Sequence, residues 1–281
     1  MSKVNDFKLA NRFAITGGDQ YLQAVNEKGE YQASTRTETR YQIQVAKYGR
    51  QFDISWEALI NDDLGALGDT PQRFGMAAVR TEHRIVTALY ARSAVLYTGG
   101  HGNFSAAALT IGSLETGVEA MAAVVDANGE PIMNRAAVLV VPPALEMTAR
   151  QIITSSTKMW LADSDDVTPP AAYPMNNVIK GYGLQLVVDP YLPVIDTTNG
   201  ATGWYLFANP ADIAALEVAW LKGHERPEIV MKASDKVSLS GAAIHPMSGD
   251  FATDNVFYRV RHVFGGITLD WRATYAGGLS L

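Results

Sequence analysis

The chain has 281 residues, 47% of them apolar, and a net charge of −6. This length and composition suffice for a sizeable core, and the absence of cysteine excludes disulfides, thiolate metal sites and a cysteine nucleophile. Residues 1–100 hold 12 Lys and Arg against 11 Asp and Glu, so the acidic excess lies in the rest of the chain. This distribution of charge argues against a protein that binds nucleic acid through clustered Lys and Arg side chains.

The first segment, residues 1–29, has little pattern of its own. Its apolar residues are scattered, and Gly17-Gly18 and Gly29 interrupt it. We expect an arm that gains order only against a neighbouring chain, with a disordered terminus as the alternative. Nothing in it resembles the apolar core of a signal peptide, and no run anywhere approaches the ~20 apolar residues of a membrane span. The sequence therefore predicts a protein made in the cytoplasm.

Residues 30–55 have the pattern of an extended β-hairpin. Apolar and polar residues alternate in Tyr41–Val45 and again in Arg50–Ile54, as in strands with one apolar face. Lys47-Tyr48-Gly49 lies between the two runs, where the pattern predicts a turn. Because a two-stranded ribbon is marginal alone, we expect this hairpin to lie on another surface.

One long helix is predicted after the hairpin, over residues 71–92. Asn61-Asp62-Asp63 favours a turn, and Asp69-Thr70-Pro71 sets a good N-cap residue before a proline suited to the first helical turn. A stripe of apolar and small residues repeats at spacings of three and four. Its members are Phe74, Ala77, Ala78, Thr81, Ile85, Ala88 and Leu89. All four arginines of this segment lie off that stripe, at Arg73, Arg80, Arg84 and Arg92.

The middle of the chain alternates helices and buried strands. A short helix is predicted over 114–125, and residues 136–141 form an apolar run of buried-strand type that Pro142-Pro143 ends. A helix over 144–153 follows. Two further strands, 184–188 and 204–207, are expected in the same sheet.

Two long strands are predicted near the C-terminus. Alternate residues between Val256 and Phe264 share one face, and after Gly265-Gly266 alternate residues between Ile267 and Tyr275 share another. Such aromatic strands need cover, so we place both against the long helix. That lobe would be discontinuous in sequence, with the chain leaving near residue 136 and returning near residue 236. The fold class is α+β.

Little in the sequence indicates catalysis. Asp163-Ser164-Asp165-Asp166 lacks the Gly and distal Glu of a calcium loop, and Gly99–Asn103 lacks the ending of a phosphate-binding loop. There is no Gly-x-Ser-x-Gly nucleophile motif. Metal-ligand spacing is also missing among the five histidines, which are His83, His101, His224, His245 and His262. We therefore expect no enzyme activity, no cofactor and no metal.

The order of elements resembles the major capsid proteins of tailed bacteriophages with the Hong Kong 97-type fold, in particular the Mu-like head-subunit branch. Five stretches carry the resemblance, which covers nearly all of the chain beyond residue 30. They are Lys47-Tyr48-Gly49-Arg50-Gln51-Phe52, Glu57–Gly65, Arg80-Thr81-Glu82, Val138–Glu146 and Val260–Arg272.

That resemblance implies a division of the chain. It gives an N-terminal arm (1–29), an extended hairpin loop (30–55), a peripheral domain (56–135 and 236–281) with the helix at about 71–92 as its spine, and an axial domain (136–235). In this family the hairpin overlaps an adjacent subunit. The candidate contact residues are Tyr41, Ile43, Lys47, Arg50 and Phe52. Some members of the wider fold cross-link a hairpin lysine to a neighbour's asparagine, but no motif here assigns the partner residues, and we interpret Lys47 as a surface lysine.

The resemblance implies a structural protein that self-assembles into hexamers and pentamers of an icosahedral shell around double-stranded DNA. Implied partners are a scaffold, a maturation protease, a portal and decoration proteins, and the implied location is the virion, with the host cytoplasm before assembly. Two alternatives stay open. One is an encapsulin-type compartment shell, and the other is an α+β ligand-binding protein, for which the sequence offers no set of convergent polar residues.

Overall fold

The structure is a computed structural model that describes residues 2–16, 22, 24–25, 27–31, 33, 36–61, 69–126, 128–132, 134–160 and 173–280. The chain forms two compact units. Unit 1 comprises Met1–Ala10, Gln42–Val86 and Val218–Gly266, and unit 2 comprises Asn11–Tyr41, Thr87–Glu217 and Ile267–Leu281. The expected features at Gly17-Gly18, Asp62-Asp63 and 163–166 lie outside the described residues. Within them, no helix is long and apolar enough to cross a membrane.

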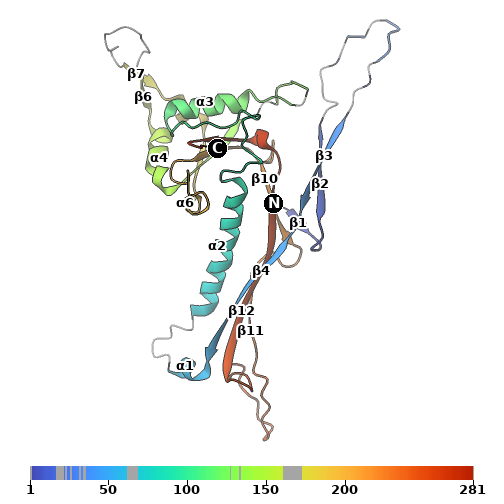
Figure 1. The fold of residues 1–281 in the computed structure, drawn as a ribbon, viewed down its shortest axis with the longest axis vertical. Coiled ribbons are helices and arrows are strands. Elements are labelled where there is room, and N and C mark those ends of the chain that lie inside the picture. The colour runs from blue at the N-terminus through green and yellow to red at the C-terminus, as the bar shows by residue number, and fades with distance from the viewer. Residues whose placement is uncertain are drawn as a thin grey trace. The chain divides into compact units, whose positions relative to one another are not determined.

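Unit 1 is built on a sheet of five strands (Figure 1). The strand order is β1 (Ser2–Val4), β10 (Leu216–Leu221), β12 (Asn255–Thr268) and β11 (Glu228–Met231), and β4 (Ala46–Ser55) also pairs with β12. β1 runs parallel to β10, whereas β4 and β11 run antiparallel to β12. The 14-residue β12 is therefore the strand that holds this sheet together.

Helix α2 (Thr70–Tyr90) covers one face of that sheet, after the short helix α1 (Trp56–Ile60). Its Phe74 and Ala78 pack with Ile54 of β4 and with alternate residues of β12 in one apolar cluster. The buried residues of β12 in that cluster are Val256, Tyr258 and Val260. The long helix predicted from the sequence is present, and its small residues allow close approach to the sheet.

The turn predicted at Lys47-Tyr48-Gly49 is wrong. β4 continues through these residues and pairs with β12 from Ser55 opposite Asn255 to Ala46 opposite Phe264. Alternation within 41–54 indicates strands but cannot say which strand each one pairs with, and β12 offers a longer partner than a local hairpin does. A Cβ at Gly49 would lie 2.9 Å from the carbonyl oxygen of Val260, so glycine here permits close approach of the two strands.

The hairpin of this region instead joins β2 (Ala10–Thr16) to β3 (Thr37–Ile43), which form a two-stranded sheet. Residues 1–29 thus contain two strands, β1 and β2, where the sequence suggested a patternless arm. The alternation of Leu9, Phe13 and Ile15 was the missed signal. The limits given for arm, extended loop, peripheral domain and axial domain refer to roles in an assembly, and they remain a proposal.

Unit 2 contains a four-stranded sheet in the order β13 (Thr274–Gly277), β9 (Trp204–Ala208), β5 (Ala136–Val141) and β8 (Gln185–Val188). β5 is parallel to β8 and antiparallel to β9, and β13 is antiparallel to β9. The three strands predicted in the middle of the chain are therefore present, and in one sheet. The remaining elements are α3 (Ile111–Ala122), the 3-10 turn η2 (Pro143–Leu145), α4 (Glu146–Thr154), β6 (Thr157–Trp160), β7 (Tyr173–Asn176), α5 (Val178–Tyr182), α6 (Leu192–Ile195) and η3 (Trp271–Ala273).

The inner strands β5 and β9 of this sheet are covered on both faces, which explains the unbroken apolar sequence of β5. Leu139 and Val141 belong to one apolar cluster, and Val140 between them belongs to a second. On β9, Trp204 and Leu206 contribute to the first cluster and Tyr205 to the second. A strand covered on both sides needs apolar residues at every position.

The last expected strand, over 267–275, differs from the structure. β12 continues through Gly265-Gly266 to Thr268, and after the turn η3 the strand β13 joins the four-stranded sheet of unit 2 instead of the face covered by α2. Gly277 of β13 lies directly against the Trp204 ring and Gly265 against the Gln44 backbone, so a Cβ would clash at either place. These close approaches fix the partner of each strand.

A buried polar cluster joins the end of α2 to the segment after β8 within unit 2. Asp189 accepts a hydrogen bond from the Thr87 hydroxyl at 2.6 Å and another from the Tyr90 hydroxyl on the same oxygen. Its second oxygen accepts the Tyr191 amide at 2.8 Å. Burial, followed by the hydrogen bond to Asp189, raises the pKa of Tyr90 far above its ordinary value. The Asp189 carboxylate thus links the end of α2 to the segment that follows β8.

Candidate interaction surfaces

The β2–β3 ribbon is the first candidate surface, because it exposes large apolar side chains. Phe13 is 56% and Ile15 67% exposed, and the two share one face of β2. The two strands pair with no further strand among the described elements (Figure 1). On the other face of β2, Arg12 makes an ion pair with Glu217 of β10 at 2.9 Å. A ribbon of two strands with an uncovered apolar face favours contact with another surface.

The structure distributes the five contact residues expected from the sequence over two sheets. Tyr41 and Ile43 lie on β3, and Lys47, Arg50 and Phe52 lie on β4. Ile43 is only 1% exposed, so its side chain packs inside its own chain. Burial and then the nearby Asp270 carboxylate raise the pKa of half-buried Tyr41.

The three candidates on β4 are exposed, and their partners on β12 show which face each occupies. Arg50 lies opposite Val260 and Phe52 opposite Tyr258, on the face that α2 covers, whereas Lys47 lies on the other face of the strand. Lys47 is thus on a sheet strand and not at a hairpin tip. The interpretation of Lys47 as a surface lysine stays a prediction.

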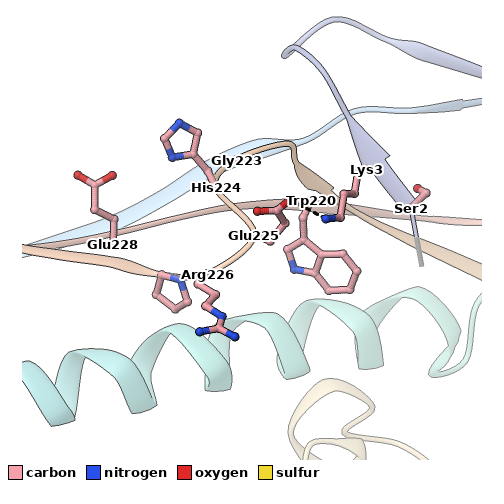
Figure 2. A pocket seen from close by; sticks show the side chains of 9 residues that line it. Ser2, Lys3, Trp220, Gly223, His224, Glu225, Arg226 and Glu228 are labelled. Atoms are coloured by element: carbon pink, nitrogen blue, oxygen red, sulfur yellow. Dashed lines mark ion pairs between the residues drawn. The ribbon is translucent and has the colours of Figure 1, made fainter.

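A cavity of about 820 Å³ lies in unit 1 between β1, the end of β10 and the turn after it (Figure 2). Figure 2 shows Lys3 reaching Glu225 near the ring of Trp220, and the Lys3–Glu225 ion pair measures 2.8 Å. The hydrogen bond from Lys3, followed by backbone amides, lowers the pKa of Glu225 to about 2. This arrangement fastens the N-terminal strand, and it contains no nucleophile beside a base.

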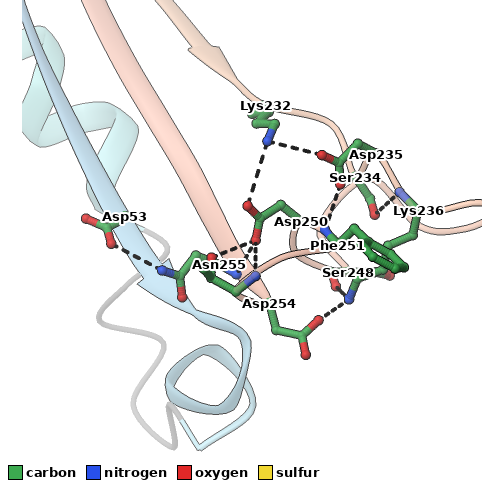
Figure 3. A network of polar contacts seen from close by, with 11 residues as sticks. Asp53, Lys232, Ser234, Asp235, Lys236, Ser248, Asp250, Phe251, Asp254 and Asn255 are labelled. Atoms are coloured by element: carbon green, nitrogen blue, oxygen red, sulfur yellow. Dashed lines mark hydrogen bonds and ion pairs between the residues drawn. The ribbon is translucent and has the colours of Figure 1, made fainter.

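The connection between β11 and β12 is held by a polar network (Figure 3). Asp250 accepts hydrogen bonds from the Thr253 hydroxyl at 2.8 Å and from the amides of Thr253 and Asn255 at 3.1 Å, while Asp235 accepts the Phe251 amide at 2.7 Å. The Thr253 hydroxyl is the main cause that lowers the pKa of Asp250. The network leaves three apolar side chains almost fully exposed. They are Val237, Leu239 and Phe251.

In the described part of the chain, no group of three His, Asp or Glu side chains could hold a metal ion. The histidines make structural contacts: His101 stacks on Trp271 with ring centroids 4.1 Å apart, and His262 Nε2 lies 3.1 Å from a Glu82 oxygen. The exposed apolar and charged surfaces are therefore the features that call for a role.

Comparison with known proteins identifies a family for this chain. The model of the family described as "Phage capsid protein" matches residues 38–277. None of the curated proteins matches this sequence.

Three solved structures illustrate the likeness in fold. The capsid of cyanophage P-SCSP1u is 13% identical at a TM-score of 0.56, covering 98% of this chain and 84% of that one. A Microbacterium phage Oxtober96 structure is 10% identical at 0.55, covering 95% and 82%. The capsid of Myoviridae phage XM1 is 10% identical at 0.53, covering 98% and 88%. At these identities the likeness shows a shared fold.

Proposed function

This chain belongs to the phage capsid protein family, and from that premise we propose that its copies form hexamers and pentamers of an icosahedral shell that encloses double-stranded DNA. The chain is a structural capsid subunit with the Hong Kong 97-type fold, as the sequence predicted. Its membership of the Mu-like branch stays a prediction. The location is the virion, and we propose the host cytoplasm as the place of synthesis.

The observation that carries this proposal is the uncovered apolar face of the β2–β3 ribbon. Phe13 and Ile15 lie on a two-stranded sheet that the described part of the chain leaves open. Burying one such side chain contributes about 1.5–3 kcal/mol, which is available only when another copy supplies the cover. We therefore propose that β2 and β3 together form the extended loop that overlaps a neighbouring subunit, and that β4, the second half of the segment 30–55, is not part of it.

Assembly by many modest contacts suits a protein whose exposed apolar side chains lie on several separate elements. Each copy in a shell is held by several neighbours at once, so weak contacts act together as a multivalent interaction. The β11–β12 connection and the exposed residues of β4 supply further contact sites on the same subunit. We propose a geometric role without enzyme activity, in which shell stability is inseparable from assembly.

Electron microscopy of the purified chain, with mass determination by light scattering, tests this proposal. Closed shells or rings of six and five copies are expected. Particles that enclose a protein cargo in place of DNA would favour the compartment alternative. A chain that stays monomeric at high concentration, even with its scaffold supplied, would contradict the proposal.

The ribbon itself is tested by the double substitution Phe13→Asp/Ile15→Asp. Because both side chains are exposed in the free subunit, the variant should fold as the wild type does and fail to form shells. Thr39→Asp, at an exposed polar position of β3, adds charge to the same ribbon without removing apolar surface and serves as the control. Normal shells from the double variant would remove the ribbon from the contact.

A further inference from the structure

A smaller cavity of unit 1, about 360 Å³, lies between α2 and the sheet. Its walls are the β4 segment Tyr48–Arg50, the helix positions Ala77, Ala78, Arg80 and Thr81, and Val260 and His262 of β12. Two elements distant in sequence thus place one arginine each, Arg50 and Arg80, at the same opening. The volume suits one side chain better than an extended polymer.

Both arginines lack a counterion. Neither Arg50 nor Arg80 makes an ion pair with any described residue, although both are exposed at the cavity. The nearest carboxylate on the helix, Glu82, is engaged by His262 at 3.1 Å. A guanidinium presents donors in a planar fork that matches a carboxylate, so the opening carries two such forks without an acceptor.

The inner wall of the cavity adds an unsatisfied polar group. His262 is only 4% exposed, and its Nδ1 atom has no hydrogen-bond partner among the described residues. A buried ring nitrogen without a partner is unusual in a folded protein. Because this nitrogen is itself buried, a group bound at the opening would not reach it, and the two arginines are the donors that the opening offers.

We propose that this cavity binds the carboxylate of an acidic side chain from a second copy of the chain. This inference rests on the proposed assembly. It assigns a partner to Arg50, which the sequence predicted as a contact residue. It adds Arg80, which the sequence placed only on the polar side of the helix. Charge complementarity supports this occupant, because the chain has 29 Asp and Glu against 23 Lys and Arg. Several exposed carboxylates have no ion pair among the described residues; examples are Glu38, Glu57, Glu119 and Asp212.

A DNA phosphate is the competing occupant, and the geometry favours it less. Proteins that follow a nucleic acid backbone align cations along a groove and neutralise several phosphates in a row. Here two arginines converge on one pocket-sized opening that is walled by α2 on one side and by β4 and β12 on the other.

Carbodiimide coupling with the variant Arg80→Lys tests the proposal on assembled particles. The lysine keeps the positive charge, and the reagent joins it to a touching carboxylate as an amide while taking up the released water. Particles assembled from two isotopically labelled populations should give a ladder of covalent multimers on denaturing gels. Mass spectrometry should find peptides that join residue 80 of one label to an acidic residue of the other.

Arg84→Lys is the matched control, because Arg84 is exposed one turn further along α2 and does not line the cavity. Coupling at residue 80 no greater than at residue 84, or coupling confined to chains of one label, would overturn the inference. Wild-type chains that never assemble would refute the proposed function instead, so the two failures are distinguishable.

A charge reversal provides a second measurement that needs no coupling chemistry. Arg50→Glu/Arg80→Glu should lower the yield of shells by at least about tenfold, because like charges would meet in the contact, with circular dichroism showing a folded subunit. Unchanged shell yield combined with lost salt-sensitive DNA binding would assign the arginines to DNA and sink the proposal.

Discussion

The four-stranded sheet and the β2–β3 ribbon are both β structure of one chain, yet they bury their side chains in opposite ways. Trp204, Tyr205 and Leu206 on β9 are at most 1% exposed, whereas Phe13 and Ile15 on β2 are more than half exposed. The sheet finds helices and loops of its own chain on both faces. The ribbon has one uncovered apolar face. The sheet is completed by folding of the chain, and we propose that the ribbon is completed by assembly.

This difference teaches where each kind of mutation should act. A change in the sheet removes contacts that the isolated subunit already has, so it lowers the free energy of unfolding. Under the proposed contact, a change in the ribbon should act on the shell and leave the free energy of unfolding of the isolated subunit nearly unchanged. The four substitutions below are ranked by their expected effect on the isolated subunit.

Trp204→Ala should have the largest effect. The indole is fully buried and its Nε1 donates to the Ala107 carbonyl at 3.1 Å, so truncation leaves a cavity and an unpaired acceptor. We expect a loss of about 3–5 kcal/mol in the free energy of unfolding, measured by denaturant titration of the subunit. Val178→Ala, at an exposed position of α5, should change it by less than about 0.5 kcal/mol. Equal effects of the two would break the comparison.

Asp189→Ala comes next, because it removes the buried acceptor that the hydroxyls of Tyr90 and Thr87 share. Unsatisfied buried groups cost about 1–3 kcal/mol, and the same titration measures the loss. Asp212→Ala removes an exposed carboxylate from unit 2 and is the control. If both variants unfold at the wild-type midpoint, the polar cluster does not stabilise unit 2.

Asp250 should give a smaller effect that depends on pH. Its pKa is lowered in the folded state, mainly by the Thr253 hydroxyl. Since the unfolded-state pKa is roughly 3.9, the stabilisation is present above that pH and is lost as the pH falls through the folded-state pKa. Thermal unfolding should therefore shift less between pH 7 and pH 3 in Asp250→Asn than in the wild type. An identical shift in the two proteins would show that this carboxylate does not contribute.

Phe13→Ala should have the smallest effect on the subunit and a clear one on the shell. Because the ring is exposed in the free chain, the free energy of unfolding should stay within about 0.5 kcal/mol of the wild type. Assembled particles should melt at a lower temperature than wild-type particles, as scanning calorimetry can show. A destabilised free subunit would mean that the ribbon is already covered, which would erase the contrast with the four-stranded sheet.

Part of the fold could be predicted because its signals are local. The helix over 70–90 and the buried strand over 136–141 follow from spacing and from unbroken apolar sequence, and both are present. The predicted turn at Lys47-Tyr48-Gly49 failed because a tyrosine, a glycine and flanking polar residues satisfy a strand equally well when a long partner exists. The cavity between Arg50 and Arg80 was also out of reach, since these residues are 30 positions apart and meet only when α2 packs on β4.

The sequence alone determined the class of the molecule, the long helix, the central strands and the resemblance to capsid proteins, because periodicity and short motifs are properties of neighbouring residues. The tertiary structure was needed to show which strands pair, that β4 and β13 join sheets of different units, and that β2 and β3 form the exposed ribbon. Strand pairing depends on distant residues that compete for the same backbone hydrogen bonds, and that competition is settled when the whole chain packs.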